Sequence, residues 1–328
     1  MTTVAYPGAT GQVGVTDAAN FIPELWSDEI VATYKSNLVM PQLVVTLNHV
    51  GKKGDTIHIP TPTRDAASAK AENTVINIIA NTEGVKNFTI SEHWEYSRLI
   101  EDIVKVQAID SLRPFYTDDA GYALATRVDT ELHQEGVKLN AYGHQGAGAT
   151  VEASAYTQGA VIGSDGATNW DPGANSNAGN AAALTDAGIR RVVQSLDDND
   201  VPSARRHLVI PPVEKRKLLG NSRFTEQAFT GETGGGNSIR NGLVGDVYGV
   251  DIYVSNNLEN VTATDNSTDQ IAAMLFQREC IVFIEQLRPR VQTQYKQEYL
   301  ADLFTADLIF DAGVLRPEAG QVIVVDDV

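Results

Sequence analysis

The chain has 328 residues, which suits about two domains of ordinary size, and 42% of them are hydrophobic, enough for real cores. Its 42 acidic and 25 basic residues give a net charge of −17, which argues against the basic stripe that non-specific nucleic-acid binding requires. The single cysteine, Cys280, excludes an internal disulfide and multi-cysteine zinc or iron–sulfur sites. It opens the apolar run 280–284, so we expect a small buried hydrophobic residue.

The N-terminal part shows no targeting signal. It lacks the basic region and apolar core of a signal peptide, and synthesis in a cytoplasm is therefore expected. No stretch of about 18 apolar residues occurs, so we expect no membrane span. Residues 1–20 are rich in Gly, Thr and Ala and predict an extended arm. A short helix capped by Ser27 should follow and end at Pro41.

Two stretches of alternating apolar residues predict a two-stranded β-arm. The first runs over 56–60, after the turn 51–54, and a loop rich in proline and small polar residues follows it. The second begins at Phe88 and places Phe88, Trp94 and Tyr96 on one face. A two-stranded ribbon is marginally stable alone in water, so this arm needs a partner surface, for which a neighbouring subunit is the obvious candidate.

The best helix of the chain is predicted at about 118–141. Thr117 is a suitable N-cap, and apolar residues recur at helical spacing behind it. The preceding segment is expected to end near Pro114. Gly121 and Gly136 each cost about 1 kcal/mol in a helix interior, so we expect another backbone to approach closely there.

The rest of the chain predicts interleaved helices and strands. Residues 143–183 are low in complexity and predict a long loop or an insertion. The expected elements are a helix capped by Thr185, a buried strand at 207–210, a short helix from Pro212 to 219, a strand at 250–254 and apolar runs at 271–276, 281–284, 308–315 and 322–325. This order lacks a strict βαβ rhythm and therefore favours the α+β class.

No motif predicts catalysis, a cofactor or a metal. The glycine-rich stretch 231–238 lacks the Gly-Lys-Ser/Thr of a phosphate-binding loop. The six histidines show neither HExxH nor HxH spacing, and the Asp/Asn-rich stretches do not match an EF-hand loop. No GxSxG elbow occurs, and nothing beside Cys280 marks a nucleophile. We therefore predict a non-enzyme with no cofactor and no catalytic or metal-binding residues.

Four stretches, in this order, resemble the major capsid proteins of tailed bacteriophages with the Hong Kong 97-type fold. Residues 54–98 are similar to the extended E-loop of that family, and 120–129 to its spine helix. Residues 201–211 with 242–258 are similar to its axial domain, and 308–318 to the closing strands of its peripheral domain. The resemblance covers about residues 20–325, and order and spacing carry it rather than any single motif.

The resemblance implies a domain plan and a function. The plan has an N-terminal arm (1–50), an E-loop (51–98), a peripheral domain with the spine helix (99–182 and 271–328) and an axial domain (183–270). The implied function is a structural protein of the virion capsid. It would self-assemble as hexamers and pentamers into an icosahedral shell around double-stranded DNA, without sequence-specific binding. A separate scaffolding protein and a portal are implied partners, and a decoration or cement protein is compatible with it.

The residues expected at subunit interfaces lie in or beside the arm: Lys52, Lys53, Arg64, Lys70, Glu72, Phe88, Trp94 and Tyr96. Some relatives in the resembled family join subunits through Lys–Asn isopeptide bonds. Three of the arm lysines could take that role, but the sequence marks neither a partner asparagine nor a catalytic acid.

Two other functions stay open. An encapsulin-like protein compartment belongs to the same structural class and would be distinguished by cargo enzymes in place of DNA. An acidic extracellular hydrolase or glycan-binding protein would be a monomer with a ligand cleft. The missing signal peptide and the lack of aromatic clusters in the loops disfavour it.

Overall fold

The computed structural model describes residues 38–62, 67–76, 78, 83–103, 112–139, 151–152, 162–166, 183–221, 246–262 and 269–326. The expected arm at 1–20, the helix after Ser27, the glycine-rich stretch 231–238 and Arg64 lie outside these residues.

The described residues form helices and strands that gather into two large sheets and one ribbon. The helices are α1 (Met40–Leu43), α3 (Leu112–Val137), α4 (Asp186–Asp198), α5 (Pro212–Leu219) and the 3-10 turn η4 (Pro317–Ala319). The strands are β1 (Val45–Asn48), β2 (Thr56–Pro62), β3 (Glu83–Thr89), β4 (Glu92–Glu101), β5 (Val151–Glu152), β6 (Ile162–Gly163), β7 (Arg206–Ile210), β8 (Asp246–Val247), β9 (Val250–Val254), β10 (Asn260–Thr262), β11 (Asp269–Gln277), β12 (Ile281–Lys296), β13 (Ala301–Val314) and β14 (Gly320–Asp326). This mixture confirms the predicted α+β class.

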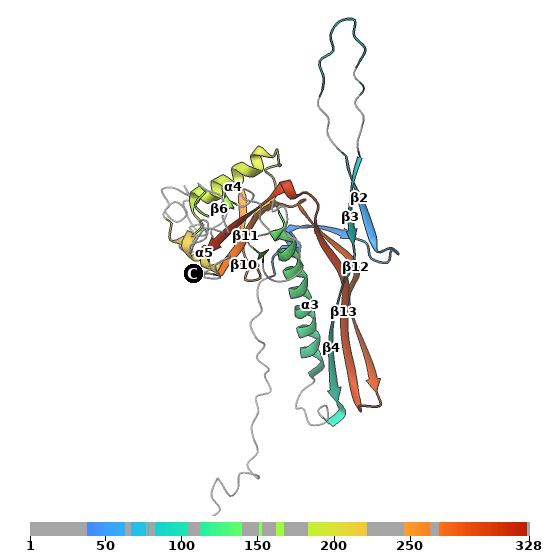
Figure 1. The fold of residues 1–328 in the computed structure, drawn as a ribbon. Coiled ribbons are helices and arrows are strands. Elements are labelled where there is room, and N and C mark those ends of the chain that lie inside the picture. The colour runs from blue at the N-terminus through green and yellow to red at the C-terminus, as the bar shows by residue number, and fades with distance from the viewer. Residues whose placement is uncertain are drawn as a thin grey trace, which may run out of the picture.

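The first sheet is long and narrow, with strand order β1-β12-β13-β4. Its strands are antiparallel neighbours except for β1, which runs parallel to β12. The helix α3 lies along this sheet (Figure 1). Leu124 and Leu132 of α3 belong to the same buried core as Phe304 and Phe310 of β13. The sheet and the helix therefore hold each other in place.

The second sheet lies on the other side of α3 (Figure 1). Its strand order is β5-β10-β11-β7-β9-β8, with β14 also pairing with β11 and β6 pairing with β14. The expected buried strand appears as β7, every residue of which is buried. Helix α4 packs on β14 and β6 through its apolar stripe of Ile189, Val192 and Leu196.

The predicted β-arm is present, but its second strand differs from the prediction. Strand β2 pairs with β3, from Thr56 opposite Thr89 to Pro62 opposite Glu83. The chain then leaves the ribbon, and β4 pairs with β13 along its whole length. The single long strand expected from Phe88 through Tyr96 is therefore wrong. The seven-residue β2 offers too few partners for it, whereas β13 offers a full ladder of backbone hydrogen bonds.

The long helix is also shifted relative to the prediction. It begins at Leu112 because Pro114 falls in its first turn, where a missing backbone N–H costs nothing. It ends at Val137, before the predicted end. Among the described residues no atom lies within 4 Å of a Cβ built on Gly121, so they do not supply the close backbone neighbour expected there. At Gly136 the close neighbour is a side chain, with Sδ of Met274 at 2.5 Å from the position of a Cβ.

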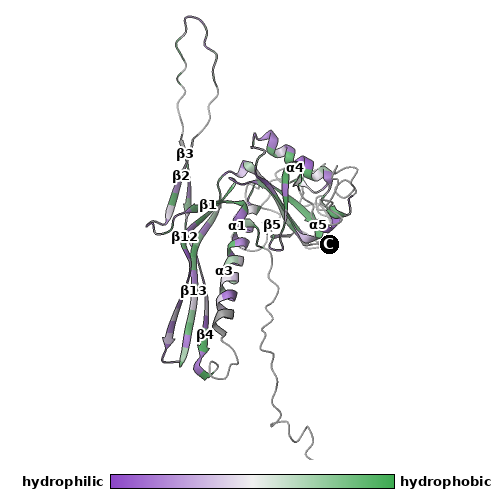
Figure 2. Cartoon of the chain, turned by 180° about the vertical axis from the view of Figure 1, so that it is seen from behind, coloured by the Kyte–Doolittle hydropathy of each residue, from purple (hydrophilic) through white to green (hydrophobic). Residues whose placement is uncertain are grey.

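Several local predictions are confirmed. Thr185 caps α4 by accepting a hydrogen bond from the backbone N of Gly188 at 3.1 Å. Pro212 opens α5, and β9 occupies the predicted range. The thiol of Cys280 is completely buried, and burial raises its pKa, so it is an unreactive core residue. The strands β12 and β13 extend much further than their apolar runs, with hydrophilic and hydrophobic residues mixed along their outer parts (Figure 2).

Candidate self-assembly surfaces

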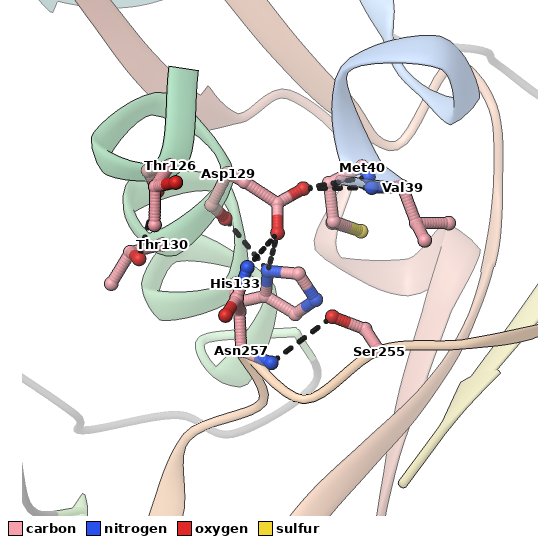
Figure 3. A network of polar contacts seen from close by, with 8 residues as sticks. All are labelled: Val39, Met40, Thr126, Asp129, Thr130, His133, Ser255 and Asn257. Carbon is pink, nitrogen blue, oxygen red and sulfur yellow. Dashed lines mark hydrogen bonds and ion pairs between the residues drawn. The ribbon is translucent and has the colours of Figure 1, made fainter. Parts of the chain in front are cut away.

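A buried polar network ties α3 to segments from two distant parts of the chain (Figure 3). The carboxylate of Asp129 is fully buried, and its Oδ1 accepts hydrogen bonds from the backbone N of Val39 (3.1 Å) and Met40 (2.9 Å). Its Oδ2 accepts from Nδ2 of Asn257 at 2.7 Å. Helix α1 has no capping side chain of its own, so Asp129 supplies the cap from α3.

His133 lies one turn along α3 from Asp129 and is equally buried. Its Nδ1 donates to the backbone carbonyl of Asp129 at 2.7 Å. Burial lowers the pKa of His133, because desolvation disfavours the charged imidazolium more strongly than the Asp129 carboxylate favours it. The imidazole is therefore neutral near neutral pH. The network fixes α1, and through it β1 and the base of the β2–β3 ribbon, relative to α3.

Strand β4 is attached to α3 by two aromatic residues that the sequence predicts at a subunit interface. The guanidinium of Arg127 lies over the ring of Trp94, 4.0 Å from its centroid, and donates to Glu131 at 2.6 Å. The hydroxyl of Tyr96 donates to Asp119 at 2.6 Å. Both aromatic residues thus contact α3 of their own chain, although Trp94 remains 37% exposed.

Carboxylates gather where α3 meets the long sheet. Burial, together with the charges of Glu135, Glu92 and Glu131, raises the pKa of Asp311 on β13 to about 7. Burial also raises the pKa of Glu135, although Lys138 donates a hydrogen bond to it. No group of three or more metal-ligating side chains occurs among the described residues. With a pKa of about 7, the carboxyl of Asp311 exchanges its proton near neutral pH.

A charged ladder crosses three strands of the same sheet. Arg290 on β12 donates two hydrogen bonds to Asp307 on β13, at 2.8 and 2.9 Å. His93 on β4 reaches the same carboxylate at 3.4 Å. The hydrogen bond from Arg290 lowers the pKa of Asp307. Bidentate arginine–carboxylate pairs are the strong ones, so this ladder fixes the register of the outer sheet.

The β2–β3 ribbon is anchored at its base and bare toward its far end. At the base Phe88 is buried against Val282 and Ile284. Beyond the paired strands the side chains of Val75, Ile76 and Ile78 are 91%, 64% and 84% exposed. Figure 1 shows the β2–β3 ribbon extending away from the rest of the chain. Exposed apolar residues gathered on a projection are typical of a contact surface.

Four further predicted interface residues are described by the structure, and all four are charged and exposed. Lys52 and Lys53 are exposed between β1 and β2, and Lys70 and Glu72 are exposed between β2 and β3. Trp94 and Tyr96 therefore lie together at α3 and Phe88 is buried, whereas these four charged residues lie apart from the three aromatic ones. The sequence interpretation missed Val75, Ile76 and Ile78. The sequence does contain a signal for this surface, which is an apolar run inside a polar loop. Such a run has no strand partner to bury it.

Comparisons with known proteins identify the family and the fold of this chain. The sequence matches the family described as phage capsid protein over residues 101–323. The chain belongs to this family. The resemblance to tailed-phage major capsid proteins is confirmed, and this capsid protein is a structural protein rather than an enzyme. Comparison with curated protein sequences finds no match.

Solved capsid structures share the fold of this capsid protein at low sequence identity. The structure of Mycobacterium phage Che8 is 22% identical, with a TM-score of 0.68, over 93% of this chain and 97% of that chain. The capsid of cyanophage P-SCSP1u is 17% identical, with a TM-score of 0.72, over 94% of each chain. The mature capsid of bacteriophage PhiM1 is 12% identical, with a TM-score of 0.68, over 100% of this chain and 97% of that chain. In the part of this capsid protein that the structure describes, no helix is long and apolar enough to cross a membrane.

Proposed function

We propose that this capsid protein self-assembles as hexamers and pentamers into an icosahedral shell that encloses double-stranded DNA. The observation that supports this most directly is the exposed apolar end of the β2–β3 ribbon, at Val75, Ile76 and Ile78. Burying these side chains would lower the free energy, and only a surface outside their own fold can bury them. A neighbouring copy supplies such a surface at every position of a shell.

The domain plan of the assembly is part of the proposal. Residues 51–98 act as the E-loop and lie over a neighbouring subunit, and residues 183–270 form the axial domain and meet their copies at the capsomer centre. Residues 99–182 and 271–328 form the peripheral domain, and 1–50 the N-terminal arm. The proposed interface side chains are Lys52, Lys53, Arg64, Lys70 and Glu72, with Phe88, Trp94 and Tyr96 supporting the E-loop from its own chain.

The proposed partners follow from the same assembly. The acidic surface disfavours tight DNA binding, so packaged DNA stays mobile inside the shell. A separate scaffolding protein and a portal assist assembly in the host cytoplasm, and a decoration protein can bind the finished shell.

Deletion of 64–81 tests the role of the ribbon end. The remaining chain can close through Thr63 and Thr82, because Pro62 and Glu83 already face each other in the β2–β3 ladder. We expect a folded monomer that forms no stable shells in negative-stain electron microscopy, while the full chain forms closed particles. Intact shells from the deletion variant would contradict the proposal.

A length-preserving variant separates the apolar contact from the length of the loop. Val75→Ser, Ile76→Ser and Ile78→Ser together should lower particle yield while thermal unfolding of the monomer stays unchanged, because these side chains are exposed. Particles of the full chain should contain double-stranded DNA. Cargo enzymes in place of DNA would instead indicate a protein compartment.

A further inference from the structure

Within the described residues, both sides of the long sheet end in a strand edge that has no strand partner over most of its length. Strand β12 pairs with β1 only over Val282 to Glu285, so among the described residues no strand pairs with its outer edge over 286–296, although the Gln286 side chain donates to the carbonyl of Gly54. On the opposite side β13 is the one strand that pairs with β4 in the part of the chain that the structure describes. Free strand edges present backbone N–H and C=O groups to solvent, and a second chain commonly covers them.

The two edges carry opposite charge. Strand β12 has Arg288, Arg290 and Lys296 and no carboxylate over 286–296, which is notable in a chain with a net charge of −17. Strand β4 has three carboxylates, at positions 92, 95 and 101, against the one cation of position 98. The basic run and the acidic run are nearly equal in length.

Part of this charge is already engaged inside the chain. Arg290 is held by Asp307, and Glu92 accepts a hydrogen bond from the indole N–H of Trp94 at 2.7 Å. Arg288 forms an ion pair with Glu285, with 3.5 Å between Nε and Oε2, and still keeps 67% of its side-chain surface exposed. The groups that remain for an outside partner are Arg288 and Lys296 on one edge and Glu95 and Glu101 on the other.

Apolar side chains accompany the charges on both edges. Val291 and Tyr295 on β12 are 49% and 45% exposed, and Leu99 on β4 is 46% exposed. Contact between the two edges would remove this surface from water and align the opposite charges. Charge arrangement of this kind sets the register and the choice of partner more than it sets raw affinity.

We propose that the basic edge of β12 in one copy contacts the acidic edge of β4 in the next copy. This inference rests on the proposed self-assembly and names the two surfaces that meet within a ring of subunits. The two surfaces differ, so the contact is heterologous and a rotation repeats it from copy to copy until the ring closes. Pro289 and the register shifts between Glu285 and Arg290 interrupt the ladder, so side chains make the contact there.

Charge reversal on one edge tests the contact. The basic-edge variant carries Arg288→Glu and Lys296→Glu, and the acidic-edge variant carries Glu95→Lys and Glu101→Lys. Arg290 is left intact because it holds Asp307. Each variant alone should reduce the assembled fraction, measured by analytical ultracentrifugation, by about tenfold or more, because like charges then face each other. The variant with all four changes should assemble again.

A mixture of the two assembly-deficient variants gives a sharper test. Each copy of one variant fits only copies of the other, so an equal mixture should form rings that contain both in alternation. Such rings hold an even number of subunits. Native mass spectrometry should therefore find mixed rings with equal amounts of the two variants and no mixed pentamers.

A matched control and the contrary outcomes complete the test. Arg316→Glu reverses a charge at the exposed position just before η4, outside the proposed axial domain and on neither edge of the long sheet, and should leave assembly unchanged. Thermal unfolding of each variant checks that the monomer is folded. If the basic-edge variant assembles normally, or if the four changes together do not restore assembly, the inference is wrong while the proposed self-assembly stands. If the unaltered chain forms only monomers, both fail.

Discussion

Among single residues, Asp129 has the most consequential position, because one carboxylate caps α1 and holds Asn257 from a buried site on α3. Asp129→Ala should lower the free energy of unfolding by about 3 kcal/mol, since it leaves buried donors without an acceptor. Urea unfolding of the monomer measures this loss.

The control for Asp129 separates a buried carboxylate from an exposed one. Asp198→Ala removes an exposed carboxylate at the end of α4 and should change the free energy of unfolding by less than about 0.5 kcal/mol. Equal changes in the free energy of unfolding would show that the buried carboxylate stabilises the fold no more than an exposed one.

Two glycines make a second pair with opposite expected outcomes. A Cβ on Gly313 would overlap the ring of Phe88 at the base of the ribbon, so Gly313→Ala should destabilise the chain by about 2 kcal/mol. A Cβ on Gly121 would meet open space in α3, so Gly121→Ala should stabilise it by about 0.5 to 1 kcal/mol. Melting temperatures that move in the same direction for both would contradict the packing described at Gly313.

At the scale of elements, the contact between α3 and β13 should make stability depend on pH. An unfolded aspartate releases its proton near pH about 4. The folded chain holds the proton of Asp311 until about pH 7. The folded state therefore binds more protons between these values, and the free energy of unfolding falls as pH rises through this range.

Asp311→Asn mimics the protonated carboxyl at every pH and should remove part of this fall. Compared with the unaltered chain, the variant should gain about 1 kcal/mol at pH about 8, a figure discounted because Asp311 is partly exposed. A residual slope should remain, because the pKa values of Glu131 and Glu135 are raised as well. Asp198→Asn should keep the original pH profile, and a profile left unchanged by Asp311→Asn would rule out this role.

Elements with a local signal could be predicted, and elements stabilised by distant partners could not. Thr185 and Pro212 mark the starts of α4 and α5 through their own chemistry, so the sequence locates both helices. The outer parts of β12 and β13 are polar, and the partner strand rather than apolar alternation makes them strands. The division of the predicted strand between β3 and β4 likewise depends on which neighbour is available, which periodicity does not encode.

At the scale of the whole molecule, the order of the elements carried more information than any of their motifs. An arm, a long helix, a middle domain and closing strands indicate a capsid fold even at the 12–22% identities of the capsid structures compared above. The cap that Asp129 supplies to α1 joins residues 90 positions apart, and no local pattern announces it. The same limit applies to the candidate surfaces, since exposure is decided only after the core has formed.

The burial of Cys280 has a practical consequence for particles built from this chain. The one thiol is sealed inside the core beside the carbonyl of Arg316, so the folded surface offers nothing to a maleimide dye. A cysteine introduced at an exposed position such as Glu318 of η4 would be the one reactive thiol in each copy. Fluorophores, spin labels or cargo peptides could then be attached once per subunit, at a known position, without first removing a native cysteine.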